Sequence, residues 1–281
     1  MYREIQKDRQ RNQEAVSSKT ERRRKGFAIT ASTLKIIAVI TMLVDHVAAI
    51  VLVKWMISRN VLEIIDYEGG RVMSLLTGEY GTVLDIYMLM RNVGRLAFPI
   101  YCFLLVEGFL RTRNVRKYLG RMFVLALLSE VPFDLAFSGA AFYWGYQNVI
   151  FTLFLALAAM YVCSMVAEKV ENTILRLLVT AAIWGGAAVI AELMQTDYSA
   201  KGVLCIAVLY LLRNTGATQL LGGAIAFVWE MPASLAFLPI ALYKGEKGRS
   251  LKGFFYGFYP IHILILYLIC LCMGMGHIPV I

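Results

Sequence analysis

The 281-residue sequence lacks most of the short motifs that mark soluble enzymes and metalloproteins. It has no GxSxG nucleophile elbow, no HExxH or HxxxH pair and no Walker A loop. Nothing therefore supports a lipase-like serine nucleophile, a metal site or a nucleotide-binding loop. Its five cysteines lie inside apolar stretches without a CxxC pair, which predicts small core residues and neither a disulfide framework nor a structural zinc. A cleavable secretory signal is also missing, so we expect the first apolar run to be retained.

Charged residues make up only 17% of the chain, whereas 59% are hydrophobic and the mean hydropathy is +0.65. This balance is typical of a polytopic helical membrane protein. Hydropathy predicts an all-α fold with about nine transmembrane helices around a polar intramembrane cavity, the sixth to eighth of them short. The expected spans are 34–53, 92–110, 117–137, 148–167, 174–193, 202–212, 219–229, 233–243 and 254–273.

The distribution of positive charge predicts the orientation of these spans. With the N-terminus inside, 22 of the 28 Lys and Arg residues fall in inner segments and six in outer ones, as the positive-inside rule requires. The C-terminus is then outside, in a multi-pass protein of the cell membrane. We divide the chain into a basic cytoplasmic tail (1–33) and one transmembrane domain (34–275), with two short surface helices expected in its outer segment (54–91). The tail suits an anionic lipid surface better than nucleic acid.

Asp45 and His46 stand in the middle of the first apolar run. A central charge costs roughly 2.5–3.5 kcal/mol on insertion scales, so such residues usually have partners or a function. At 1.5 Å per residue, Asp45 lies about 16 Å from the inner end of its span, near the midplane. Neighbouring residues on a helix point about 100° apart, so both side chains can face a cavity without pairing with each other.

Further polar residues in or beside the other spans could complete a column across the membrane. Glu130 and Asp134 are one turn apart and face one direction. The remaining members are Glu107, Arg95, Asn148, Thr152, Asp197, Tyr198 and His262. Structural roles stay open for several of them: Arg95 as a partner of Glu130 or Asp134, Glu107 as a partner of Arg111, and His262 as a hydrogen-bonded core residue.

Several runs of this sequence resemble the TraX family. They are Leu34–His46, Gly94–Phe109, Thr112–Tyr118, Ser129–Asp134, Asn148–Thr152 and Phe254–His262, and the likeness covers about residues 32–275. TraX-like proteins are akin to the acyltransferase-3 family and to the lysosomal heparan glucosaminide acetyltransferase. The resemblance implies transfer of an acetyl group from cytoplasmic acetyl-CoA to an acceptor at the outer face, with no metal. The namesake acetylates a conjugative pilin, but the acceptor here stays open between a peptide amine, a glycan and a small molecule.

Within that chemistry we expect His46, the histidine of the first span, to act as the base, oriented by Asp45 or Glu130. His262 would bond the thioester carbonyl or relay a proton. Arg95 would stabilise the acceptor, together with Asp134, Asn148, Thr152, Asp197 and Tyr198 as substrate-binding residues. Basic side chains on the inner face are expected to hold the phosphates of coenzyme A, or else only to set the topology. They are Arg111, Arg113, Arg116, Lys117 and Arg121.

Two other classes of protein compete with the enzyme. Intramembrane Asp, Glu and His chains also mark proton relays, which favours a proton-coupled transporter or flippase. Against this, transporters usually consist of two matched repeats, and nine spans cannot be divided into two equal repeats. In a non-enzymatic assembly factor the same polar groups would only join helices.

Overall fold

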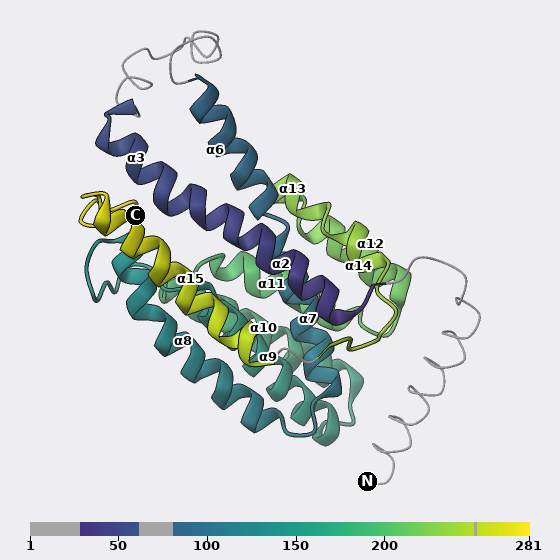
Figure 1. Cartoon of the computed structure of the whole chain (residues 1–281). Helices are drawn as coiled ribbons and strands as arrows, with labels where there is room; N and C mark the ends of the chain where they lie inside the picture. Colours follow the sequence, from purple (N-terminus) through teal and green to yellow (C-terminus); the bar gives the residue numbers. More distant parts are fainter. Residues whose placement is uncertain (1–28, 62–80, 250–251) are drawn as a thin grey trace.

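The computed structural model describes residues 29–61, 81–249 and 252–281, and over these ranges the chain is all-helical apart from two isolated β-bridges. Long helices run back and forth along one direction (Figure 1). This confirms the predicted fold class at the level of an all-α chain with apolar, membrane-length helices.

The first rod consists of α2 (Ala31–His46), one π-helical segment η1 (Val47–Leu52) and α3 (Val53–Ser58). The π turns begin directly after the Asp45–His46 pair. Such segments widen a helix locally and are frequent at functional sites. The predicted outer segment therefore begins as a continuation of this rod, and its residues 62–80 lie outside the described ranges.

The second rod is interrupted where it passes Asp45. It consists of α6 (Gly81–Gly94) and α7 (Ala97–Arg111), joined by a turn at Arg95 and Leu96. Helix α6 takes up most of the remaining outer segment, so the second apolar helix begins at residue 81 and not at 92. Ten of the fifteen residues of α7 are buried, which places this helix at the centre of the core.

Three long helices follow: α8 (Val115–Phe137), α9 (Val149–Lys169) and α10 (Thr173–Leu193). An asparagine precedes each of them and accepts a hydrogen bond from a backbone N–H of the first turn: Asn114, Asn148 and Asn172. Such caps satisfy donors that a helix start leaves without partners. The sequence thus encodes three of the helix starts locally.

The last third of the chain contains shorter elements and one long helix. They are α11 (Ser199–Leu211), α12 (Gly216–Ala226), η2 (Val228–Glu230), α13 (Met231–Ser234), α14 (Phe237–Ala241) and α15 (Lys252–Cys272). As predicted, the sixth to eighth apolar segments are short, and the eighth is divided into two pieces.

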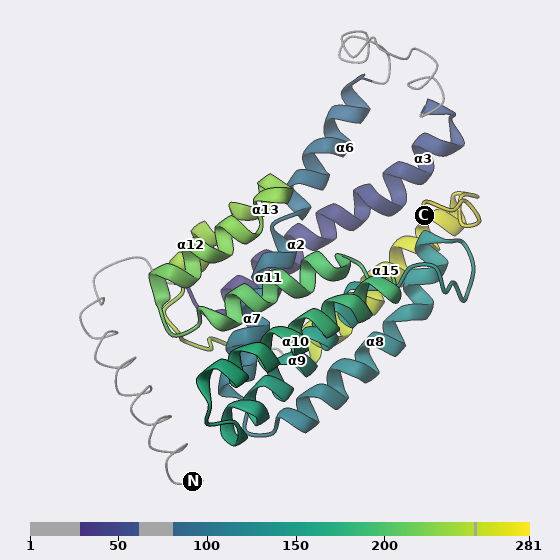
Figure 2. The same cartoon turned by 180° about the vertical axis from the view of Figure 1, so that it is seen from behind.

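Helix α15 closes the bundle by packing between α8 and the first rod, α2 with η1. Seen from behind, α11 lies beside α9 and α10, while α12 and α13 cover the flank beside α6 and α7 (Figure 2). The buried core runs through α7, α9 and α11. Its fully buried side chains include Ile100, Leu157, Met160, Ile206 and Leu209.

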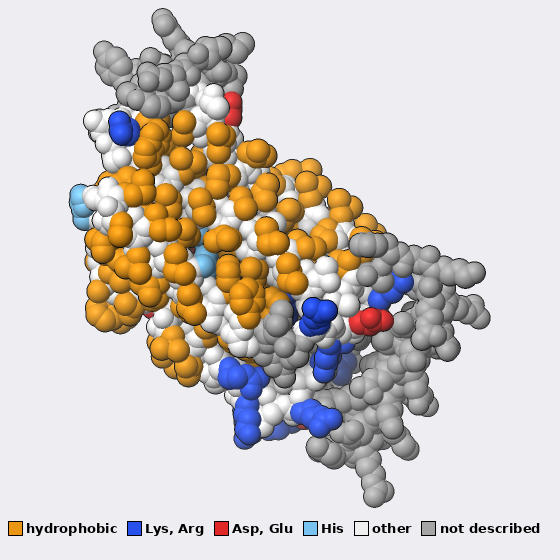
Figure 3. Space-filling model, viewed as in Figure 1, with side chains coloured by type: hydrophobic (Ala, Val, Ile, Leu, Met, Phe, Trp, Pro, Cys, Tyr) orange, Lys and Arg blue, Asp and Glu red, His pale blue; other side chains and the backbone are white. Residues whose placement is uncertain are grey.

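Within the described residues, five helical stretches are long and apolar enough to cross a membrane: 31–58, 81–111, 149–169, 173–193 and 253–272. Helix α8 is 23 residues long but carries several charges, among them Arg116, Lys117 and Glu130. Apolar side chains cover the middle of the visible face, and Lys and Arg gather at one end (Figure 3). We call this the basic end; it includes Arg111, Arg113, Arg116, Lys117 and Arg121. The count of nine spans and their orientation stay predictions.

At the basic end, the start of α2 is held by the segment that precedes α15. The backbone N–H groups of Ala31 and Ser32 donate to the carbonyls of Glu246 (2.8 Å) and Lys247 (3.1 Å). Gly248 in this segment has φ +69°, and an added Cβ would lie 2.0 Å from the Ser32 Oγ atom. Only glycine fits this approach, so the segment and the first helix are interlocked.

We expect Gly248→Ala to lower the free energy of unfolding by about 1–3 kcal/mol, because the new methyl group would overpack against Ser32 in an unfavourable left-handed conformation. Thermal unfolding in detergent measures the change. Gly120→Ala is the matched control, since a Cβ there meets no atom within 4 Å. Equal melting temperatures for the two variants would contradict the interlock.

Candidate active site: a cavity that ends at a histidine pair

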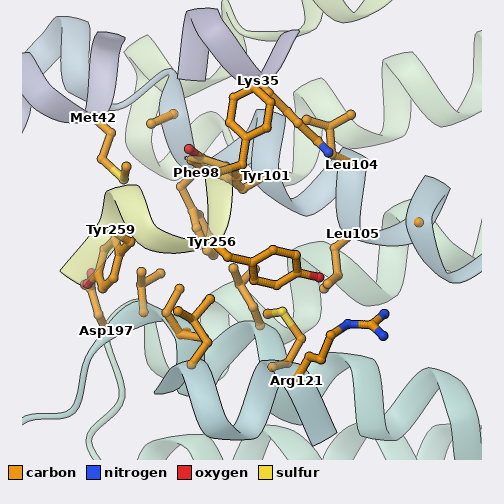
Figure 4. Close-up of a pocket in the computed structure, with 18 of the residues that line it drawn as sticks. Lys35, Met42, Phe98, Tyr101, Leu104, Leu105, Arg121, Asp197, Tyr256 and Tyr259 are labelled. Carbon is orange, nitrogen blue, oxygen red and sulfur yellow. The ribbon is translucent and has the colours of Figure 1, made fainter. Parts of the chain in front are cut away.

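A cavity of about 650 Å³ lies among α2, α7, α8, α9 and α15. Along α2 its wall extends from Lys35 to His46, about 16 Å at 1.5 Å per residue. Much of its wall is apolar and includes Met42, Leu104, Leu105, Met122, Leu125 and Leu153. Asp197 and Tyr259 lie at one side of it and Arg121 at the other, with Tyr256 between them (Figure 4). The cavity thus joins the basic end to the middle of the bundle.

The wall of the cavity near the basic end combines cations with aromatic rings. The Arg121 guanidinium lies 5.8 Å from the Tyr118 ring centroid, and the Lys35 ammonium lies 5.2 Å from that of Phe255. Tyr256 adds a further ring to the wall. Two positive charges beside flat rings suit a ligand with anionic and planar parts.

His46 and His262 form a pair where α2 and α15 meet. The His46 Nδ1 and His262 Nε2 atoms are 2.6 Å apart, and the His262 Nδ1 atom lies 2.7 Å from the Phe258 carbonyl oxygen. The edge of His46 contacts Phe137 and Tyr259. His262 is buried and does not line the cavity, whereas His46 does. One histidine is thus presented to the cavity and the other supports it from behind.

Asp45 is directed away from the histidine pair. Its carboxylate accepts a hydrogen bond from Arg91 Nη1 at 2.8 Å. A Cβ on Gly94 would lie 2.2 Å from the Asp45 Cβ atom, so only glycine lets α6 approach α2 at this level. Glu130 instead accepts from Asn148, the N-cap of α9. The expectation that Asp45 or Glu130 orients His46 is therefore corrected: His262 is the hydrogen-bond partner of His46.

Asp197 and Tyr198 line the cavity opposite α2, on the turn before α11. The Tyr146 hydroxyl donates to the Asp197 carboxylate at 2.7 Å, and Thr152 donates to the Asp197 carbonyl. Tyr198 has φ +65° and stacks on Phe98 with ring centroids 3.7 Å apart. Strained backbone of this kind persists where the surroundings hold it and is common at functional sites.

Other predicted site residues lie near the cavity without lining it. Arg95 pairs with Glu230 at 2.5 Å, not with Glu130 or Asp134. Asp134 is buried and accepts from the Tyr143 backbone N–H at 2.8 Å. One oxygen each of Glu130 and Asp134 is buried without a hydrogen-bond partner. These two carboxyl groups therefore lie in a second polar region, between α8 and the start of α9.

The basic residues predicted to hold phosphates have different surroundings. Arg121 lines the cavity. Arg111 donates to Glu107 and to the Gly245 carbonyl, and Arg116 donates to the Tyr161 hydroxyl. The pairing of Glu107 with Arg111 agrees with the structural alternative, so Glu107 does not belong to a continuous polar column. Arg113 and Lys117 are exposed at the same end.

A family model described as TraX protein matches residues 30–270 of this chain. The chain belongs to the TraX family. It is also similar to a protein of Dichelobacter nodosus named "Probable fimbrial assembly protein FimC, serogroup H1", with 31% identity over 258 residues, 84% of this chain and 94% of that protein. A comparison with solved structures gives no match.

Several of the TraX-like runs of the sequence contribute to the cavity or to the histidine pair beside it. Leu34–His46 supplies one wall from Lys35 to His46, and Gly94–Phe109 supplies the opposite one through Phe98, Tyr101 and Leu105. Phe254–His262 adds Tyr256, Tyr259 and the second histidine. The candidate site of this TraX-family chain therefore lies within the matched residues 30–270.

Sequence reasoning missed several residues of this site. Arg91 lies four residues before Arg95, in the last turn of α6, and that spacing was a usable signal. Lys35 is the only charge in the inner half of the first apolar run. Glu230 lies at the end of a short helix, and no sequence pattern connects it with Arg95. Among the described residues, no cluster of three or more His, Cys, Asp or Glu is arranged to hold a metal ion.

The Arg91–Asp45 pair should be energetically coupled, because both side chains are largely withdrawn from solvent at the level of the helix break. We expect Arg91→Met alone to destabilise the protein more than the double variant Arg91→Met/Asp45→Asn, since the single change leaves a carboxylate without its partner. Unfolding of all four forms in detergent gives the coupling energy. Additive effects would contradict the pairing.

Proposed function

We propose that this TraX-family protein is a membrane-embedded acyltransferase. It moves an acetyl group from acetyl-CoA at the basic end to an amine or hydroxyl acceptor that reaches the site from the opposite face. The observation that carries the proposal is the cavity, which runs from two cations at the basic end to a histidine near the middle of the bundle. The kinship with the acyltransferase-3 group is part of this proposal.

The basic end is cytoplasmic in this proposal, and the membrane is that of the cell. Lys and Arg collect on the cytoplasmic side of membrane proteins, and here they collect at the end where the cavity has Lys35 and Arg121 in its wall. Cytoplasmic acyl-CoA could then enter directly. Its phosphates would lie near these two cations, and its long arm would extend along the apolar wall of the cavity.

The proposed reaction needs one base and balances without a metal. A nitrogen of His46 takes the proton as the acceptor amine or hydroxyl attacks the thioester carbonyl carbon. A new carbon–nitrogen or carbon–oxygen bond forms, the carbon–sulfur bond breaks, and the coenzyme A thiolate leaves with the proton from His46. Hydroxyl groups of Tyr101 and Tyr198 line the same cavity and are candidate donors to the oxyanion. An acetyl-His46 intermediate is the alternative route.

The acceptor site in this proposal is the polar region around Asp197, Arg95 and Glu230. A relative named for fimbrial assembly makes an exported filament subunit the first acceptor to test. A glycan or a small molecule would need the same base and the same donor. The alternative function is a proton-coupled transporter or flippase, for which His46 and the carboxyl groups would be a proton relay.

We expect purified protein in nanodiscs to hydrolyse radiolabelled acetyl-CoA slowly, and His46→Ala to lose this turnover by about 10²–10⁴-fold, the usual contribution of a general base. His277→Ala is the control, because His277 follows α15 and is not in the cavity wall. Label retained on wild-type protein without acceptor would favour the acetyl-enzyme route. Absent binding and turnover by well-folded protein would favour the transporter.

Replacement of Arg121 by Ala should raise the KM for acetyl-CoA by about 10- to 150-fold with little change in kcat, because a lost charge-assisted contact to phosphate weakens binding by about 1.5–3 kcal/mol. Arg116→Ala is the matched control, since that side chain bonds Tyr161. With S-acetyl-pantetheine, which lacks the nucleotide, the effect of Arg121→Ala should vanish. An equal effect on both donors would contradict phosphate binding by Arg121.

A further inference from the structure

We infer that His262 fixes the tautomer of His46: His46 carries its proton on Nδ1 and presents an unprotonated Nε2 to the cavity. His262 is thus a positioning residue, in the place that a carboxylate takes in many histidine-dependent enzymes. The catalytic consequence rests on the proposed function, whereas the tautomer itself can be measured without any activity.

The tautomer of His262 is determined by a backbone carbonyl of α15. The Phe258 carbonyl oxygen can only accept hydrogen bonds, and the His262 Nδ1 atom is 2.7 Å away. His262 Nδ1 must therefore carry a proton. His262 is four positions after Phe258 in the same helix, so this hydrogen bond forms within about one turn and fixes the orientation of the imidazole ring. The Phe258 ring stacks on the imidazole, with centroids 4.6 Å apart, and further restricts it.

The proton position on His46, in α2, follows from that on His262. A neutral imidazole with a proton on Nδ1 has a lone pair on Nε2. That lone pair faces the His46 Nδ1 atom at 2.6 Å, so His46 must donate there. A neutral His46 with a proton on Nδ1 has its own lone pair on Nε2. Two hydrogen bonds in series thus determine which nitrogen of His46 can act as a base.

Both rings are expected to be neutral in the resting protein. Aromatic side chains surround them: Phe137 and Tyr259 at the edges of His46, and Phe258 on the face of His262. The adjacent carboxylate of Asp45 is bonded to Arg91 and makes no hydrogen bond to either ring. An imidazolium in such surroundings would lack a counter-charge, which is unfavourable.

This arrangement gives His262 a specific task during the reaction. When His46 Nε2 takes the acceptor's proton, His46 becomes an imidazolium and its Nδ1–H bond to His262 becomes charge-assisted. His262 accepts this bond without itself gaining or losing a proton. The positive charge is therefore stabilised only while the reaction proceeds, and no buried anion is needed when the site is at rest.

The test is nitrogen NMR of protein labelled with ¹⁵N-histidine in nanodiscs. The chain has three histidines, and His277→Gln removes the one outside the pair. We expect His46 and His262 both to show a protonated Nδ1 and an unprotonated Nε2. A protonated Nε2 on His46 in the wild-type spectrum would overturn the inference, whether or not any variant folds.

Two substitutions test the role of His262. His262→Phe keeps a flat ring but removes the acceptor, so His46 should lose its Nδ1–H signature and kcat should fall about 10²–10⁴-fold with little change in KM. His262→Gln keeps an oxygen that can accept from His46, and should recover most of the rate and the wild-type tautomer. Equal spectra and rates for the Phe variant and the wild type would overturn the assigned role.

The outcomes separate this inference from the proposed function. A wild-type spectrum with the expected tautomers, in a protein that never transfers an acetyl group, would support the histidine pair and contradict the acyltransferase. Acetyl transfer that requires His46 but gives the opposite tautomer would support the acyltransferase and contradict the role of His262.

Discussion

The structure depends on one constraint: polar groups in the middle of a membrane-length apolar helix must find their partners inside the protein. Helix α2 brings two such groups, Asp45 and His46, to the same level. The two groups find different partners. Asp45 reaches Arg91 on α6, and His46 reaches His262 on α15. Two helices from distant parts of the sequence, α6 and α15, thereby contact α2 at one level, in directions about 100° apart around its axis.

These two contacts explain several irregular features of the backbone. Helix α6 can bring Arg91 to Asp45 because Gly94 leaves room, and the rod is interrupted directly afterwards at Arg95 and Leu96. The π turns of η1 begin one residue after His46. On the other side of the cavity, Tyr198 is held in a left-handed conformation against Phe98. The irregular backbone segments of the core therefore lie around the end of the cavity that is away from the basic end, where Asp45, His46 and Asp197 are.

The sequence alone predicted the class of fold well and the pairing within the site poorly. Hydropathy placed α8, α9, α10 and α15 to within two residues, but it put the start of the second apolar helix at 92 and not at 81. The asparagines at 114, 148 and 172 are local signals for three of the helix starts. The sequence also singled out Asp45, His46 and His262. The sequence could not predict which side chains of two different helices pair, because the spacing along one helix does not determine how that helix is rotated relative to another. Hence Arg95 was paired with the wrong acid, and His262 was not recognised as the neighbour of His46.

The π-helical segment has a consequence for the second half of the first rod, α3. Its wider turns rotate each residue by less than an α-helix does, so α3 is out of phase with α2. Lys54, which follows it, points inward, and its ammonium donates to the Gly276 carbonyl after α15. The two halves of the rod thus present different faces to their neighbours. An uninterrupted α-helix over the same residues would point Lys54 in another direction, away from the Gly276 carbonyl that it contacts.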